Sequence, residues 1–366
     1  MHSEKIIQVP QLSSLKEVLS AEKAVFELYI QFTDTIICLK TNHQDFARKC
    51  RDHFRACLLE PEQKPNQITE ISLFYLPPSV LCSIPLTDIL FTRLRNEQSE
   101  SWIRVDTDYM IFYQLPDFFT YYEKATGYSF GIFGSMNFLP QTFCKTSHTR
   151  RLKRIDGSTY FSMLCDHLYL LIVLINQAVC FHGALVRLGT RTVLLAGQSG
   201  QGKSTTALSL LRDGATLLSD EIVFFTSSDN GILAEGIPIR PLLVSDASIQ
   251  LSDLEKTLGN SNKEKYPVDL TGCLGKLGIK KKFPVDAILF FVPPEISGRK
   301  QHQLAPLGEM DAFERLTQQV LGYDEPCFAR QRLNFLLDLA SSSRSYAFTP
   351  SSSLVTLSSF LADSLQ

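Results

Sequence analysis

The chain has 366 residues, enough for two ordinary domains, and 44% of its residues are hydrophobic while 20% are charged. This balance is typical of a folded soluble protein. The net charge of −2 gives no electrostatic reason to expect a nucleic-acid or membrane partner. Nine cysteines without C-x-x-C spacing argue against a zinc site and a disulfide framework, and the polar first twelve residues against a signal peptide. We therefore expect reduced thiols in a cytoplasmic protein.

The first 150 residues are predicted to form an α/β domain that recognises a substrate or partner. Alternating apolar positions predict a hairpin over 26–39, and apolar residues at helical spacing predict a helix over 44–59. Short strands are predicted over 71–76, 102–105 and 109–114. An aromatic-rich stretch then favours a packed sheet face over a surface that stacks on a base. Its residues are Phe118, Phe119, Tyr121, Tyr122, Tyr128 and Phe130.

A basic cluster over 148–154 marks the predicted domain boundary. A solvated linker is the favoured interpretation, and a docking patch for an acidic substrate segment is the alternative. The helix predicted over 158–176 contains Asp166 and His167, which favours a buried helix over a membrane span. Those two residues are adjacent on a helix and point in different directions, which argues against a catalytic pair.

A core over 151–300 and a helical segment over 301–366 that packs on it are predicted next. Polar, lysine-rich residues over 263–282 predict a loop, with Lys280, Lys281 and Lys282 as a solvated run or, less favoured, a phosphate contact. Strands are predicted over 179–187, 192–196, 216–219, 222–226, 232–234, 287–292 and 346–349, and helices over 309–322, 327–341 and 353–365.

The segment from Gly197 to Ser204 is a complete phosphate-binding loop, G-x-x-x-x-G-K-S, between an apolar strand and a helix. Its glycines let successive N–H groups point inward at a phosphate, and the helix N-terminus adds its dipole. Lys203 can neutralise phosphate oxygens, and the Ser204 hydroxyl can hold Mg²⁺. We therefore predict a site for ATP and Mg²⁺. Its nucleotide-binding residues are Gly197, Gln198, Ser199, Gly200, Gln201, Gly202, Lys203, Ser204 and Thr205.

Three polar features flank this loop and match the needs of phosphoryl transfer, which are a proton acceptor, a metal clamp and added positive charge. Asp220 can take a hydroxyl proton, and the adjacent Glu221 can hold Mg²⁺ together with Ser204. Arg240 can supply positive charge, although it can equally cap a loop between prolines. His182 ends an apolar strand, where a satisfied core histidine is the alternative to a site residue.

The segments Phe181–Val186, Leu194–Ser204 and Leu217–Glu221 together resemble the catalytic core of the bacterial HPr kinase/phosphorylase family. The ending Leu217–Glu221 is more similar still to HPr-kinase-related proteins that carry a dissimilar N-terminal region. The resemblance implies a mixed α/β fold similar to the nucleotide domain of phosphoenolpyruvate carboxykinase, and Mg²⁺-dependent phosphorylation of a serine hydroxyl. It implies that Asp220 is the acid/base, that Glu221 is on the metal side, and that His182 lies beside the phosphates.

The sequence also departs from the family pattern. Glu221 stands where the family has a second aspartate, and the family's downstream glycine-rich segment has no clear counterpart. We therefore expect a substrate other than HPr. The favoured function is an ATP-dependent kinase that acts on a hydroxyl of a peptide, a protein or a small molecule, with catalytic residues Asp220, Lys203, His182 and Arg240. The alternatives are a nucleotide-binding adaptor for a partner peptide or protein and a simple ATPase, and the sequence leaves homo-oligomerisation open.

Overall fold

The computed structural model divides the chain into two compact units, which are described separately. Unit 1 comprises Met1–Ile172 and Gly322–Asp324, and unit 2 comprises Val173–Leu321 and Glu325–Gln366. The basic cluster over 148–154 lies outside the described residues, as does the predicted boundary near residue 150. The structure describes residues 4–32, 35–54, 57–59, 68–76, 80, 83–93, 101–114, 118–133, 165, 167–169, 171–173, 175–198, 200–229, 231–236, 242–244, 265–267, 282–292, 301–321, 326–351 and 357–365.

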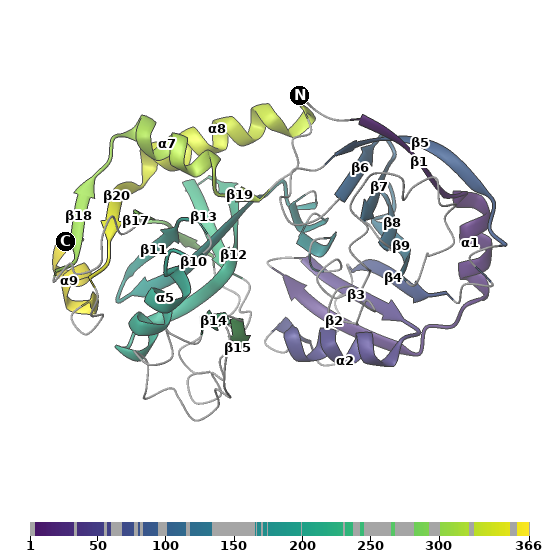
Figure 1. The fold of residues 1–366 in the computed structure, drawn as a ribbon, viewed down its shortest axis with the longest axis horizontal. Coiled ribbons are helices and arrows are strands. Elements are labelled where there is room, and N and C mark those ends of the chain that lie inside the picture. Colours follow the sequence, from purple (N-terminus) through teal and green to yellow (C-terminus); the bar gives the residue numbers. More distant parts are fainter. Residues whose placement is uncertain are drawn as a thin grey trace. The chain divides into compact units, whose positions relative to one another are not determined.

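Unit 1 contains, within its described residues, a nine-stranded sheet in the order β1-β5-β6-β7-β8-β9-β4-β3-β2 (Figure 1). Most neighbouring strands are antiparallel, whereas β4 runs parallel to both β3 and β9. Helix α1 (Leu12–Ala21) buries Leu15 and Leu19, and α2 (Gln44–His53) contacts β2 and β3. The strands are β1 (Glu4–Pro10), β2 (Phe26–Phe32), β3 (Thr35–Thr41), β4 (Thr69–Tyr75), β5 (Leu86–Arg93), β6 (Ser101–Val105), β7 (Tyr109–Gln114), β8 (Phe118–Glu123) and β9 (Tyr128–Phe133).

These elements confirm the predicted hairpin, which is the antiparallel pair β2–β3, and the three short strands β4, β6 and β7. The helix predicted over 44–59 is shorter than expected and ends at His53. It stops because the chain then turns to pair with β2, where the Leu59 N–H donates to the Tyr29 carbonyl at 2.9 Å. A backbone hydrogen bond to the sheet therefore replaces the last predicted helical turn.

The aromatic stretch forms a packed face of this sheet, as the sequence favoured. Tyr121 lies directly across from Phe130, their ring centroids are 5.0 Å apart, and both rings are buried. His167 is wholly buried in the same unit, and its two ring nitrogens lie 3.0 Å from Thr120 Oγ1 and 3.3 Å from Ser129 Oγ. His167 is therefore part of the core of unit 1, and its helical neighbour Asp166 lies outside the described residues.

Unit 2 contains a second mixed sheet, with the described strands in the order β16-β13-β12-β10-β11-β17-β20-β18 and β19 paired to β10 (Figure 1). Strands β11, β17 and β20 are parallel, while β10 is antiparallel to both β11 and β12. A separate pair joins β14 (Leu242–Val244) to β15 (Lys265–Pro267). The strands of the sheet are β10 (Val179–Leu188), β11 (Arg191–Ala196), β12 (Thr216–Ser228), β13 (Gly231–Gly236), β16 (Phe283–Pro284), β17 (Ala287–Phe291), β18 (Gln303–Pro306), β19 (Val320–Leu321) and β20 (Arg344–Thr349).

Helices cover both faces of this sheet and complete two apolar layers. On one face α5 (Lys203–Arg212) and α9 (Leu357–Ser364) pack against alternate residues of β10 and β11. On the other face α7 (Glu309–Thr317) and α8 (Pro326–Ser342) pack against the intervening residues. Because side chains alternate along a strand, the two layers assign each residue of β10 and β11 to one face of the sheet.

Three predictions about unit 2 need correction. The segments predicted as two strands, 216–219 and 222–226, form the single strand β12, because Asp220 and Glu221 stay paired with β10. The predicted loop over 263–282 contains the short strand β15, and Lys280 and Lys281 lie outside the described residues. The predicted strand over 346–349 is β20, and the segment after 300 also contains β18, an unpredicted strand that pairs with β20.

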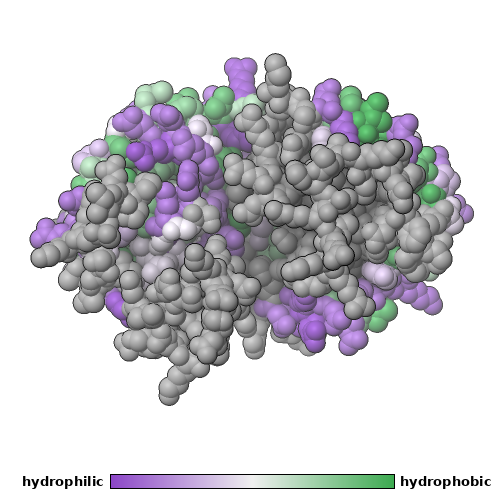
Figure 2. Space-filling model, in the orientation of Figure 1, coloured by the Kyte–Doolittle hydropathy of each residue, from purple (hydrophilic) through white to green (hydrophobic). Residues whose placement is uncertain are grey.

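The surface of each unit carries scattered apolar side chains among polar ones (Figure 2). Ile6, Leu86 and Leu90 are exposed on β1 and β5, and Leu333 and Leu337 are exposed on α8. Within the part of the chain that the structure describes, every helix is too short or too polar to cross a membrane.

Candidate active site

The predicted phosphate loop follows β11 directly and leads into α5. Gly200 and Gly202 have φ angles of 86° and 94°, which lie in the left-handed region that favours glycine. A Cβ atom at Gly197 would lie 2.5 Å from Gln201 Oε1 and 2.9 Å from the Cβ of Phe291 on β17. The first glycine is therefore required by the close approach of its neighbours, and the other two are required by the turn.

Lys203 is buried at the start of α5, with 7% of its surface exposed. Its ammonium donates to the carbonyl oxygens of Gly197 at 2.7 Å and Gln198 at 3.0 Å. The Gln198 N–H in turn donates to Gln201 Oε1 at 2.7 Å. The loop thus folds around the lysine, so that a buried cation and a helix N-terminus lie at one place.

The structure describes most of the other residues that were predicted to bind the nucleotide. Ser204 and Thr205 follow Lys203 in the first turn of α5, and both are half-buried. Gly200 and Gln201 belong to the turn before the helix. Ser199 lies outside the described residues.

The pairing of three neighbouring strands places the acidic pair level with the phosphate loop. Gly183 on β10 pairs with Ala196, the last residue of β11, on one side, and with Glu221 of β12 on the other. Neighbouring strands lie about 4.8 Å apart, so the backbones of Ala196 and Glu221 are separated by roughly 10 Å. The acidic pair, which follows α5 in the chain, thus lies level with the C-terminal end of β11.

The register also assigns Asp220 and His182 to the face covered by α5. Asp220 pairs with Ala184, and Ala184 pairs with Leu195, which packs in the α5 layer. His182 is two residues before Ala184 and therefore faces the same way. Because α5 begins with Lys203, the structure brings the side chains of Lys203, Asp220 and His182 to one face at one edge of the sheet.

The acidic pair lies at a kink in β12. Ser219 Oγ donates to the Ile222 carbonyl at 2.5 Å, across the pair, and the register with β10 shifts nearby. Glu221 has a φ of 149°, which is rare for a residue with a side chain and is typical of strained functional positions. Gly236 on β13 packs inside the kink, where a Cβ atom would lie 2.3 Å from the Leu218 carbonyl oxygen.

Asp220 is buried in this kink with 4% of its surface exposed, while Glu221 is half-buried. A buried carboxylate and a buried ammonium in one region are a feature of sites that handle charge, because low local polarity strengthens electrostatic interactions. Arg240, the fourth predicted catalytic residue, lies outside the described residues.

Two residues that the sequence did not single out belong to this region. Gln319, in the turn between α7 and β19, accepts from the Gly197 N–H at 3.2 Å through Oε1 and from the His182 N–H at 3.0 Å through its main-chain oxygen. Glu235 is a buried carboxylate on β13, beside Gly236. Neither lies in a motif, so only the three-dimensional structure relates them to the loop.

The donor atoms at this edge suit Mg²⁺. Hydroxyl and carboxylate oxygens, such as those of Ser204 and Asp220, are ligands that Mg²⁺ prefers, and it is commonly bound by one or two carboxylates together with substrate phosphates. Glu221 pairs with Gly183, so by the same alternation its side chain begins on the opposite face of the sheet. Among the described residues, His, Cys, Asp and Glu form no group of three that could hold a metal by themselves.

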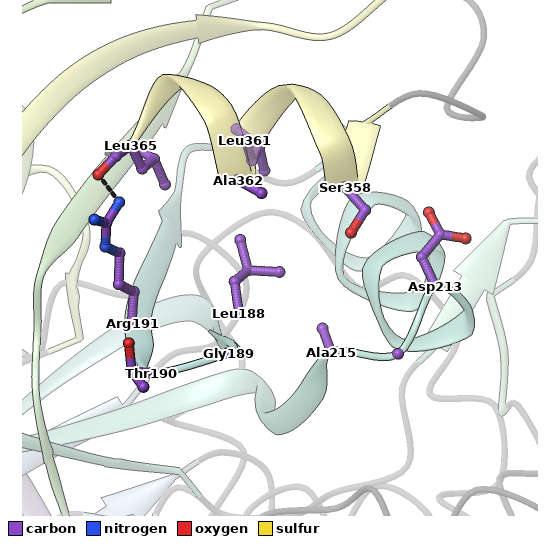
Figure 3. Close-up of a pocket in the computed structure, with 11 residues that line it drawn as sticks. Leu188, Gly189, Thr190, Arg191, Asp213, Ala215, Ser358, Leu361, Ala362 and Leu365 are labelled. Atoms are coloured by element: carbon purple, nitrogen blue, oxygen red, sulfur yellow. Dashed lines mark hydrogen bonds between the residues drawn. The ribbon is translucent and has the colours of Figure 1, made fainter.

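A cavity of about 530 Å³ lies at the far ends of β10 and β11, away from the loop (Figure 3). Its charged side chains already have protein partners, because Arg191 donates to the Leu365 carbonyl and Asp213 pairs with Arg212 at 3.0 Å. This cavity is separate from the candidate site.

No family model matches the chain. The HPr kinase/phosphorylase of Lactobacillus johnsonii is 30% identical to it over 171 residues, which cover 43% of this chain and 52% of the relative. The protein of the same name from Lactobacillus delbrueckii subsp. bulgaricus is 34% identical over 106 residues, covering 28% of this chain and 33% of the relative. Over part of its length the chain is similar in sequence to proteins named HPr kinase/phosphorylase. It spans about half the length of the first of these curated relatives.

One solved structure, of the HPr(Ser) kinase/phosphatase of Coxiella burnetii, matches 51% of this chain and 92% of its own. The TM-score is 0.26 and the identity is 13%, a likeness too small to establish the fold. The kinship therefore rests on the sequences, and the mixed α/β architecture rests on the sheets described above.

Proposed function

We propose that the chain is an Mg-ATP-dependent kinase that transfers the γ-phosphate of ATP to a hydroxyl group. The observation that carries the proposal is the shared level of the phosphate loop and Asp220 on the α5 face of the sheet. Kinship with proteins named HPr kinase/phosphorylase supports the same class of reaction.

In the proposed reaction, Asp220 accepts the proton of the acceptor hydroxyl as its oxygen attacks the γ-phosphorus in line. The bond between the γ-phosphorus and the bridging oxygen breaks, and ADP leaves. Lys203 and Arg240 neutralise the charge that develops on the phosphate oxygens, with greater effect where water is excluded. His182, on the same face as Asp220, lines the phosphate side of the site.

Ser204 and Glu221 would hold Mg²⁺ in this scheme. The metal, when bound, neutralises phosphate oxygens and orients them. Alternation along β12 starts the Glu221 side chain on the face opposite Asp220, so the proposal requires its extra methylene and the strained backbone of the kink to bring its carboxylate to the metal. The strained backbone at Glu221 is thus interpreted as part of a preorganised site.

The proposed acceptor is a serine or threonine of a peptide or protein, or the alcohol group of a small molecule. Unit 1 is proposed to select it, and unit 2 to bind the nucleotide. Because the chain spans only about half the length of the Lactobacillus johnsonii relative, the protein HPr in that relative's name does not identify the acceptor of this chain.

The test is a phosphotransfer assay with γ-labelled ATP and Mg²⁺ on size-fractionated host-cell extract. We expect Asp220→Asn to reduce transfer about 10²- to 10⁴-fold while ATP still binds. Asp213→Asn is the matched control, because Asp213 is a carboxylate of the same unit that is paired with Arg212 and lines the separate cavity. Equal labelling by the parent and Asp220→Asn would exclude Asp220 as the base. Binding without transfer would favour an adaptor, and phosphate release without an acceptor would favour an ATPase.

A further inference from the structure

We propose that Gln319 is a positioning residue that fixes the first glycine of the phosphate loop and so sets the affinity for nucleotide. Its side-chain oxygen accepts from the Gly197 N–H at 3.2 Å, and its main-chain oxygen accepts from the His182 N–H at 3.0 Å. The nucleotide part of this inference rests on the proposed function.

The bond to Gly197 answers a need that the local sequence leaves open. Gly197 follows the last ladder residue of β11 and is buried, so its N–H must find an acceptor within the protein. That acceptor comes from Gln319, 122 positions further along the chain. Where the loop begins is therefore determined partly by a distant side chain.

Gln319 is itself held firmly from both sides. Its N–H donates to the Leu316 carbonyl of α7 at 3.0 Å, and the residues after it form β19, in which Val320 pairs with Phe181 of β10. Only 7% of its surface is exposed. A side chain fixed in this way can act as a rigid reference for the loop, because few other rotamers are open to it.

The second hydrogen bond joins Gln319 to His182 on β10, a strand of the predicted catalytic face. The Gln319 main-chain oxygen fixes the N–H of His182, one residue before Gly183, which pairs with both Ala196 and Glu221. One residue thus links the start of the loop to the strand that lies between the loop and the acidic pair. Small displacements at such positions are costly for phosphoryl transfer, which depends on alignment.

The neighbouring residue provides a matched control. Gln318 is exposed, whereas Gln319 is buried, although the two side chains are identical. Gln319→Met keeps the length of the side chain and removes the acceptor oxygen, and Gln318→Met makes the same chemical change on the surface.

The experiment measures two quantities on the full chain. One is Mg-ATP affinity by calorimetry, and the other is amide hydrogen exchange of the peptide that contains Gly197, by mass spectrometry. We expect Gln319→Met to weaken ATP binding about 5- to 30-fold and to speed exchange at Gly197 in the free protein. We expect Gln318→Met to match the parent in both.

The outcomes separate this inference from the proposed function. Unchanged exchange and an ATP affinity within twofold of the parent would overturn the role of Gln319. Faster exchange in Gln319→Met, with no ATP binding even by the parent, would uphold the positioning role and remove the proposed function instead. If Gln319→Met does not fold, Gln319→Glu keeps an acceptor oxygen and adds a charge beside the phosphates. Because the acceptor is kept, we then expect exchange at Gly197 as slow as in the parent, and faster exchange would contradict the proposal.

Discussion

Units 1 and 2 each contain a mixed sheet of nine described strands and both bury polar side chains, but among the described residues the buried Lys, Asp and Glu side chains all lie in unit 2. In unit 1, Thr120, Ser129 and His167 are buried together and bond to one another inside the core. In unit 2, the buried Lys203 and Asp220 lie level with the C-terminal end of β11. Burying a charge costs more than burying a neutral polar group, so the neutral cluster of unit 1 is typical of a core and the buried charges of unit 2 are typical of a functional site.

This contrast predicts that a buried cation in unit 2 serves activity more than stability. Replacing it by Lys203→Met should lower kcat/KM for ATP about 10²- to 10³-fold, because the phosphate charge loses its main protein partner. The free energy of unfolding, from urea titration, should stay level or rise, since the buried ammonium is removed. Lys124→Met, at an exposed lysine of unit 1, should change neither quantity.

A marked loss of stability in Lys203→Met would place the lysine among structural residues and erase the difference between the units. An unchanged kcat/KM for ATP in Lys203→Met would also contradict the proposed difference between the units, because Lys203 would then not serve activity. Stability and turnover measured on one preparation separate these results.

Two glycines offer a matched steric test of the same contrast. At Gly131 of unit 1 a Cβ atom would lie 2.4 Å from the Phe119 carbonyl oxygen, and at Gly236 of unit 2 it would lie 2.3 Å from that of Leu218. Gly131→Ala and Gly236→Ala should therefore each cost about 1–3 kcal/mol of unfolding free energy, because backbone atoms must move. Only Gly236→Ala should also reduce phosphotransfer, since it displaces the kink that carries Asp220.

Equal phosphotransfer by the two alanine variants, at matched loss of stability, would show that the kink does not position Asp220. Comparing them at a temperature where both are folded separates turnover from unfolding. A loss of turnover in Gly131→Ala alone would instead point to unit 1 as the part that limits the reaction.

The sequence predicted the hairpin, the strands beside the loop and the burial of the aromatic face, because apolar periodicity reflects which side of an element is buried. It also predicted a glycine turn between β11 and α5, and Gly200 and Gly202 do have positive φ angles there. It could not predict the kink of β12, which depends on Ser219 reaching the Ile222 carbonyl and on Gly236 from another strand. The sequence also could not predict the hydrogen bonds of Gln319, because a single glutamine carries no periodic signal and its partners lie over a hundred residues away in the chain.

The smallest predicted effect concerns pH and unit 1. Burial lowers the pKa of His167 from 6.5 to about 3, so the folded protein keeps it neutral at mildly acidic pH. The unfolded chain binds a proton there below pH 6.5 and the folded chain does not until about pH 3. Stability contributed by His167 is therefore complete above pH 6.5 and is lost as pH falls toward 3, by up to about 1.4 kcal/mol per pH unit.

The measurement is urea unfolding of the parent and of His167→Gln at pH 7.5, 6.5 and 5.5. Glutamine can bond to Thr120 and Ser129 but does not titrate, so His167→Gln should lose less stability than the parent between pH 6.5 and 5.5. The difference should approach the limit for one proton, because both hydroxyl partners of His167 are buried with it and water has no access to its ring. Parallel pH slopes would mean that the ring takes up a proton inside the fold. The polar core of unit 1 would then respond to its surroundings, and the contrast with unit 2 would no longer hold.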